Sequence, residues 1–129
     1  MERVRKIVNK KLCEKFLELV EEKTDVGFSV NEQHNGTWLI EGEYWSDLGE
    51  DVIISLVVGE LDIEEIAHEM YEYAENFDAE EHASEWYNMH GEHGAPTSMR
   101  ALLEDADEQQ EKLNEIYDAM LSYLEFQRL

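Results

Sequence analysis

The chain has 129 residues, close to the usual size of one domain, and 43% of them are hydrophobic. It carries 10 Lys and Arg against 32 Asp and Glu, which gives a formal net charge of −22 and a pI near 4.3. The hydrophobic content excludes a disordered acidic tail, and the charge excludes direct binding to nucleic acid or to an anionic membrane, so we predict a single domain over residues 1–129 with a basic partner.

Residues 3–22 have the periodicity of an amphipathic helix. The residues predicted to form its apolar face are Val4, Ile7, Val8, Leu12, Phe16, Leu19 and Val20. Cys13 lies on this face or at its edge, so we expect a buried small hydrophobe rather than a nucleophile. It is the only cysteine, which excludes an intrachain disulfide and suits a reducing cytosol.

Residues 27–58 change to strand character. Polar and apolar residues alternate around Val30, and Asn35-Gly36 is a strong hairpin-turn signal. The stretch "TWLIEGEYW" reads as a second strand, and "VIISLVV" is a continuous apolar run that predicts a strand well covered by helices. We therefore predict three antiparallel strands, around Val30, over 37–45 and over 52–58.

Helical periodicity returns in the second half of the chain. A capping-box pattern that begins at Asp62 predicts a helix over 62–77. A second helix is expected over 79–90, with Asp78 as its cap and Trp86 towards the core. These two helices follow the strands directly along the chain.

The stretch "NMHGEHGAPTSM" (88–99) holds His90, His93 and the only proline. A metal site needs three or four converging ligands. The side chains that would have to complete such a set are His82, Glu85 and Glu92. The sequence has no Cys pair and no His-Glu-x-x-His pattern, and a turn between two helices accounts for the whole stretch. We therefore expect neither a metal nor a cofactor.

The last helical segment begins at Thr97 or Ser98 and runs to the C-terminus, with or without a break near residues 105–109. Arg100 is a rare cation in this segment and is expected to fix helix packing. The acids that we expect it to pair with are Glu81, Glu104 or Asp105. The predicted fold class is α+β, with an N-terminal helix, a three-stranded antiparallel sheet, and then three or four helices that cover one sheet face.

No pattern of catalytic residues stands out from the sequence. Ser55 lies in an apolar run without nucleophile-elbow glycines, and carboxylates are too numerous for a catalytic pair to be identified. The sequence also lacks a phosphate-binding glycine loop, a signal-peptide pattern and an apolar run of membrane length. We expect a cytoplasmic protein that is not an enzyme.

Acidic residues are concentrated in one half of the chain. Residues 60–129 carry twenty acids and three basic residues, whereas residues 1–25 carry six acids and seven basic residues. A halophilic protein would spread its acids more evenly, so this concentration favours a face directed at a partner. Carboxylates three or four residues apart on a helix are about 5–6 Å apart, similar to successive phosphates on one DNA strand. The residues predicted to contact the partner are Glu65, Glu69, Glu72, Glu104, Asp105, Glu108 and Glu111.

Two stretches, "YWSDLGEDVIISLVVG" and "NFDAEEHASEWYNMHGEHGAPTSMRALLEDADEQQEKL", share a pattern with known proteins. The residues that carry the pattern are Ser46, Gly49, Glu50, Asp51, Phe77, Asp78, Glu81, His82, Trp86, Pro96, Ser98, Arg100, Leu102, Glu104, Asp105 and Ala106. On these residues, residues 44–113 resemble a family of small acidic proteins carried by bacterial conjugative elements and phages. The chain departs from that family at Asp47-Leu48, where Pro-Ala is usual, and at His90, where Arg is common.

The resemblance implies a mobile-element context, in which a compact acidic protein is similar to inhibitors of host defence. We therefore expect an anti-CRISPR or anti-restriction protein that binds the basic nucleic-acid-binding surface of a CRISPR effector or restriction enzyme by DNA mimicry. The alternative is a non-enzymatic accessory or regulatory module that binds itself or another protein through apolar surface on its first or last helix. A homodimer in which Lys and Arg of one chain meet acids of another is equally allowed.

Overall fold

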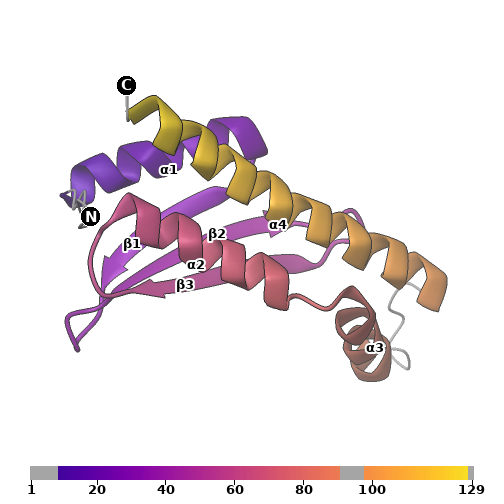
Figure 1. The fold of residues 1–129 in the computed structure, drawn as a ribbon. Coiled ribbons are helices and arrows are strands. Elements are labelled where there is room, and N and C mark those ends of the chain that lie inside the picture. The colour runs from indigo at the N-terminus through magenta and orange to yellow at the C-terminus, as the bar shows by residue number, and fades with distance from the viewer. Residues whose placement is uncertain (1–8, 91–97, 128–129) are drawn as a thin grey trace.

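The computed structural model of the protein describes residues 9–90 and 98–127, with the side chains of 89–90 and 125–127 left out. Its elements are α1 (Lys10–Thr24), β1 (Gly27–Glu32), β2 (Trp38–Trp45), β3 (Asp51–Val58), α2 (Ile63–Asn76), α3 (Ala79–His90) and α4 (Met99–Gln127). The predicted α+β fold class is confirmed, with three helices after the sheet. Figure 1 shows α1, α2 and α4 on one face of the sheet, while α3 lies beside the first turns of α4.

The strands form an antiparallel sheet in the order β1-β2-β3. Val30 pairs with Ile40, and Ile40 pairs with Leu56, so the pleat turns all three towards the helices, where they are buried. The same pleat turns Ile53 and Val57 to the opposite face, where they are 48% and 50% exposed. The prediction that the 52–58 run is well covered is therefore correct for one face of β3 and wrong for the other, because the described helices all lie on one side.

The β1–β2 turn confirms the Asn35-Gly36 signal. Gly36 donates its N–H to the carbonyl of Gln33 at 3.0 Å and has a φ of 83°, a conformation that glycine adopts without steric cost. The Thr37 hydroxyl oxygen lies within hydrogen-bond distance of Gln33 Oε1, at 2.8 Å, and of Asn35 Oδ1, at 2.6 Å. The turn therefore fixes the register in which Val30 faces Ile40.

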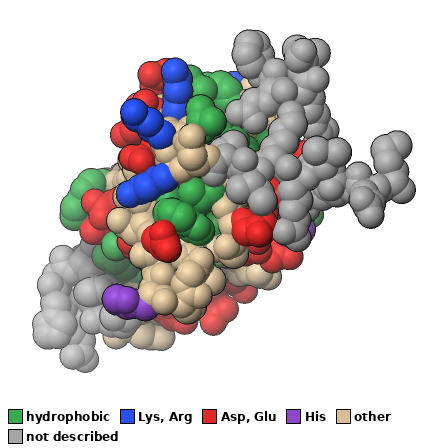
Figure 2. Space-filling view, turned by 90° about the vertical axis from the view of Figure 1, so that its left-hand side faces the viewer, with side chains coloured by type: hydrophobic (Ala, Val, Ile, Leu, Met, Phe, Trp, Pro, Cys, Tyr) green, Lys and Arg blue, Asp and Glu red, His purple; other side chains and the backbone are tan. Residues whose placement is uncertain are grey.

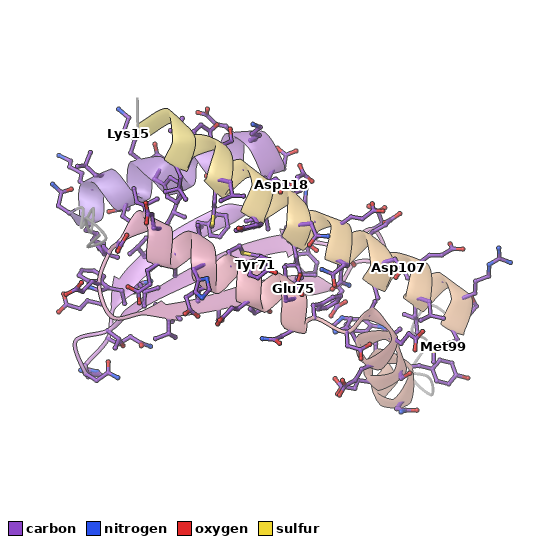
Figure 3. The ribbon with its side chains drawn as sticks, in the orientation of Figure 1. Lys15, Tyr71, Glu75, Met99, Asp107 and Asp118 are labelled. Carbon is purple, nitrogen blue, oxygen red and sulfur yellow. The ribbon has the colours of Figure 1, made fainter. Side chains whose placement is uncertain are left out.

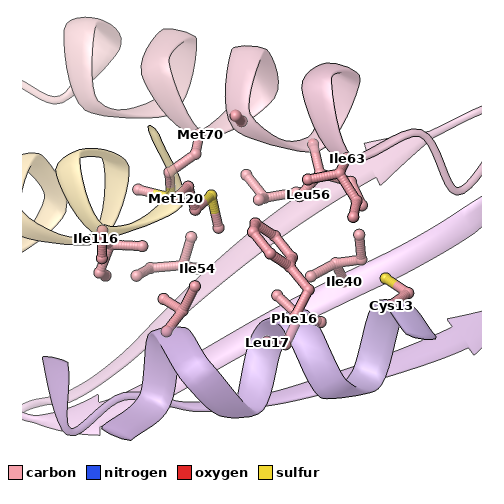
Figure 4. Close-up of a cluster of buried hydrophobic side chains, with 14 of the residues drawn as sticks. Cys13, Phe16, Leu17, Ile40, Ile54, Leu56, Ile63, Met70, Ile116 and Met120 are labelled. Atoms are coloured by element: carbon pink, nitrogen blue, oxygen red, sulfur yellow. The ribbon is translucent and has the colours of Figure 1, made fainter. Parts of the chain in front are cut away.

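The hydrophobic core lies between the sheet and the helices α1, α2 and α4 (Figure 4). Its largest fully buried side chains include Phe16, Ile54, Met70 and Met120. Leu12 was placed on the apolar face of the first helix, and this prediction is wrong, because Leu12 is 53% exposed. The face that enters the core is formed by Cys13, Phe16, Leu17, Val20 and Thr24, with the period of an amphipathic helix. Phe16 and Val20 were predicted on it, while Val4, Ile7 and Val8 lie outside the described residues.

Cys13 is buried as predicted, with an exposed fraction of 0%. Desolvation by burial, with a smaller contribution from Glu14, raises the pKa of its thiol to about 11. Because the thiolate is the reactive form, we expect Ellman's reagent to leave Cys13 unmodified at pH 7.5 in the native protein and to modify it fully in 6 M guanidinium chloride. Complete modification of the native protein within seconds would contradict this burial.

The predicted helix caps are confirmed. Asp62, Asp78 and Ser98 each accept a hydrogen bond from a first-turn backbone N–H, at 3.0, 3.1 and 2.9 Å. Such caps stabilise a helix by about 1 kcal/mol each. Arg100 pairs with Glu104 at 3.3 Å, as one of the expected alternatives, but both side chains are exposed and lie on α4 itself. This pair therefore does not fix packing between helices.

Helix α4 is continuous over 29 residues, so the suspected break near residues 105–109 does not occur. The C-terminal half of α4 enters the main core through Leu113 and Ile116. Its N-terminal half packs Leu102 and Ala106 against Ala83 of α3 in a second, smaller cluster. Helix α4 therefore contributes side chains to both hydrophobic clusters. None of the helices, over the residues described, is long and apolar enough to cross a membrane.

Candidate protein-binding site

The outer face of α4 carries a row of carboxylates. The row, called the α4 acid strip below, consists of Glu104, Glu108, Glu111, Glu115 and Asp118, all exposed. Their separations of four, three, four and three residues keep them on one side of a helix, opposite the side that enters the core. At a rise of 1.5 Å per residue, the strip extends about 21 Å along the helix. Figure 3 marks Asp118 within this row and Asp107 beside it.

The middle of the strip borders a groove of about 270 Å³ between α4 and the end of β2. Trp45, which is 66% exposed, and Asp47 line one wall, and Glu108 and Glu111 line the other. The nearby Asp47 carboxylate raises the pKa of the Glu108 carboxyl, because a hydrogen bond between the two side chains requires one of them to keep its proton. The groove therefore gathers several carboxylates, although Lys112 also lines it, 5.9 Å from the Tyr44 ring centroid.

The loop that carries Asp47 is a tight turn between β2 and β3. Ser46 donates its N–H to the Glu50 carbonyl at 2.9 Å, and its side-chain oxygen accepts the Glu50 N–H at 3.1 Å. Gly49, with a φ of 87°, donates its N–H to the Ser46 carbonyl at 2.9 Å. The positive φ favours glycine at position 49, and the hydrogen bond from the Glu50 N–H favours a hydroxyl side chain at position 46.

Buried polar side chains attach this loop to α3 and α4. Asp105, only 6% exposed, accepts the backbone N–H of Leu48 at 3.3 Å. Gln109, 3% exposed, donates to the side chains of Glu50 at 2.7 Å and Asp105 at 3.2 Å. His82 of α3 lies 2.9 Å from the other carboxylate oxygen of Glu50. The network therefore holds the groove wall in place, and it unites three residues of the sequence pattern that are far apart in the chain.

The His82–Glu50 contact raises the pKa of His82 above its ordinary value of 6.5, chiefly through the hydrogen bond to Glu50. Burial acts in the opposite direction, while the charges of Glu50, Glu85 and Asp105 add to the increase. A histidine whose folded-state pKa is raised stabilises the fold fully below its unfolded pKa, and this contribution is lost as pH rises through the folded pKa.

We therefore expect the free energy of unfolding of the native protein to decrease more steeply above pH 6.5 than that of His82→Gln. Urea unfolding at several pH values between 5.5 and 8.5 measures both slopes. All other titratable groups are common to the native protein and the variant, so the difference between the two slopes reports the contribution of His82. Parallel pH profiles would show that the His82–Glu50 pair does not contribute.

The structure distributes the predicted contact residues over three places. Glu104, Glu108 and Glu111 lie on the α4 acid strip. Glu65, Glu69 and Glu72 lie on α2, where Glu72 accepts from His68 at 3.2 Å and the other two are half-buried. Asp105 is buried in the network beneath the loop, about 100° around α4 from Glu104, so we leave it out of the proposed contact surface.

Sequence reasoning left Glu115 and Asp118 out of the contact residues, although their spacing continues the strip and could have identified them. It also missed Trp45, Asp47 and Gln109, which only the tertiary structure brings to α4. His93 lies outside the described residues, as does the side chain of His90. Among the side chains that the structure describes, no three His, Cys, Asp or Glu residues form a set that could hold a metal ion.

No family model, curated protein or solved structure matches the chain.

Proposed function

We propose that the protein is an anti-defence inhibitor of a mobile element and acts in the cytoplasm. In this proposal it binds the basic nucleic-acid-binding surface of a CRISPR effector or restriction enzyme by DNA mimicry. The observation that carries the proposal is the α4 acid strip, a straight row of exposed carboxylates on a helix anchored in two hydrophobic clusters. The role is binding rather than catalysis.

The strip has few cations to balance it. In the sequence, no Lys or Arg occurs between Lys23 and Arg100. On α4 itself, Arg100 pairs with Glu104, and Lys112 lies 3.7 Å from Glu115. Figure 2 shows the end of the molecule seen from the left of Figure 1, where Lys and Arg side chains in the upper part lie among Asp and Glu side chains. Like charges at this spacing destabilise a helix by a few tenths of a kcal/mol per pair, a cost that a cationic partner would remove.

The dimensions of the strip suit a DNA-binding groove. Its length of about 21 Å equals the axial rise of about six nucleotides of one strand of a duplex, at 3.4 Å each along the duplex axis. Because α4 is anchored in two hydrophobic clusters and by the loop network, its backbone needs no ordering on binding, which reduces the entropic cost of association. Long-range attraction between the strip and a basic surface also raises the association rate.

The experiment that tests the proposal immobilises the protein and measures binding of purified candidate nucleases at stepped salt concentrations, with and without competing duplex DNA. We expect a DNA-binding nuclease to bind at 50 mM NaCl, to weaken at least tenfold by 200 mM, and to be displaced by duplex DNA. A nuclease that binds equally well at both salt concentrations and in the presence of DNA would overturn the proposal.

The alternative role as an accessory module is supported by exposed apolar side chains on the helices for which it was predicted. Leu12 of α1 is 53% exposed and Leu121 of α4 is 36% exposed. Association through such side chains is insensitive to salt, unlike mimicry. Sedimentation of the protein alone at 50 mM and 500 mM NaCl separates the two roles, because a dimer that persists at both concentrations would favour the accessory module.

A further inference from the structure

The face of the sheet turned away from the helices, called the outer sheet face below, has an unusual composition. An antiparallel sheet with one solvated face commonly alternates apolar inward residues with polar outward residues. Here Ile53 and Val57 of β3 point outward and are about half exposed, at 48% and 50%. Val57 pairs with Leu39 of β2, and Trp45, 66% exposed, ends the same strand. Three of the most exposed large apolar side chains described thus lie on one face.

The charged residues of this face are all acidic. Glu41 and Glu43 occupy outward positions of β2 between Leu39 and Trp45, and Asp51 pairs with Trp45 across the strands. The strands and the turns between them contain no Lys or Arg. The face therefore offers apolar side chains interleaved with carboxylates, a combination that favours a partner with apolar side chains flanked by cations.

The acids of α2 extend this surface around the β3 edge. Tyr73 donates its hydroxyl hydrogen to the carbonyl oxygen of Ile53 at 3.3 Å, which places that flank of α2 against β3. Glu69 and Glu65 precede Tyr73 by four and eight residues, so they lie on the same flank. Carboxylates therefore border the apolar residues of β3 from the helix side as well as from β2.

We infer that the outer sheet face is a docking surface for an amphipathic helix of a partner protein, with Leu-type side chains on one face and Lys or Arg beside them. A helix is about 10 Å wide with its side chains, enough to cover two strands that are 4.8 Å apart. A second copy of this sheet face is a poor occupant, because it would bring Glu41, Glu43 and Asp51 against the same acids. The inference rests on the proposed function only for the basic character of the partner.

The test titrates the ¹⁵N-labelled full chain with a designed amphipathic helical peptide that carries Leu on one face and Lys on its flanks. Two matched peptides replace Leu by Ser or Lys by Glu. At 150 mM NaCl, we expect amide shifts to concentrate on the outward residues of β2 and β3 with the Leu–Lys peptide alone. Shifts confined to α4, or equal binding of the Ser peptide, would overturn the inference.

The double variant Ile53→Thr/Val57→Thr keeps β-branched side chains in β3 and removes apolar contact. We expect it to weaken binding of the Leu–Lys peptide by about tenfold or more, as for apolar side chains at the centre of an interface. Leu12→Thr, which changes an equally exposed apolar residue on α1, should leave the affinity unchanged. If both variants bind like the native chain, the inference is wrong.

This test is independent of the experiment on the proposed function. Peptide docking on the outer sheet face, together with a failure to bind any nuclease, would remove the proposed function and retain the docking surface. Nuclease binding without any peptide-induced amide shift on the strands would retain the proposed function and remove the docking surface. The shift map on the native chain needs no substitution, so a variant that unfolds leaves the inference testable.

Discussion

Replacing Phe16 by alanine is expected to lower the free energy of unfolding by about 3–5 kcal/mol. Phe16 is 2% exposed and lies between the sheet and α4, with its ring in an edge-on contact with Tyr123 at 6.5 Å between ring centroids. Removing the ring leaves a cavity that the sheet and the helices cannot collapse to fill, because both are anchored by other core residues.

The measurement is urea unfolding at pH 7, followed by circular dichroism. It is best made in 0.5 M NaCl, because screening reduces the repulsion among the acids and leaves more stability to be lost. Leu12→Ala on the same helix is the control, since Leu12 is 53% exposed, and it should change the free energy of unfolding by less than about 0.5 kcal/mol. Equal effects of the two substitutions would mean that α1 does not pack through the face seen here.

The secondary structure follows closely from local patterns. The helix predicted over 62–77 is observed over Ile63–Asn76, because its apolar period and its Asp62 cap are both set by neighbours in the chain. The β1–β2 turn was equally predictable, since its geometry depends on Asn35, Gly36 and their immediate neighbours in the chain. Elements whose signals lie within a few residues of each other were thus found from the sequence.

The features that were missed depend on contacts between distant segments. Asp105 and Gln109 resembled a break in the last helix because both are polar, but they are satisfied by Leu48 and Glu50 of the β2–β3 loop, so the helix continues. No local sequence pattern indicates hydrogen-bond partners that lie more than 50 residues away in the chain. The exposure of Ile53 could not be predicted either, since an apolar run has the same appearance whether one or both faces of a strand are covered.

The candidate site was also predictable only where its residues are close together in the chain. The acidic rows could be assigned to helices, because spacing of three and four residues is visible in the sequence. Their relation to one another could not, and the structure places the α2 acids near the β3 edge and the α4 acids beside the groove that Trp45 lines. Asp105 illustrates the limit, since it is one residue from Glu104 in the chain but lies beneath the surface.

Reversing the charge of Glu108, Glu111 and Glu115 to lysine is expected to weaken binding to a basic nuclease by more than about 100-fold and to abolish inhibition. The substitution replaces three attractive contacts with repulsion, and like-charge contacts across an interface cost several kcal/mol. The fold should be retained, because all three side chains are exposed and lie opposite the core. The thermal midpoint and the nuclease affinity are measured on the same preparations.

The matched control reverses Glu18, Glu21 and Glu22, three exposed acids of α1, which changes the net charge of the protein by the same amount. If binding depends on the α4 acid strip, the control should lose less than about tenfold in affinity, through the weaker long-range attraction alone. Equal losses would mean that net charge, and not the strip, determines affinity. Inhibition that survives the α4 reversal but is lost on reversing Glu65, Glu69 and Glu72 would move the contact to α2 and the β3 edge, where the outer sheet face begins.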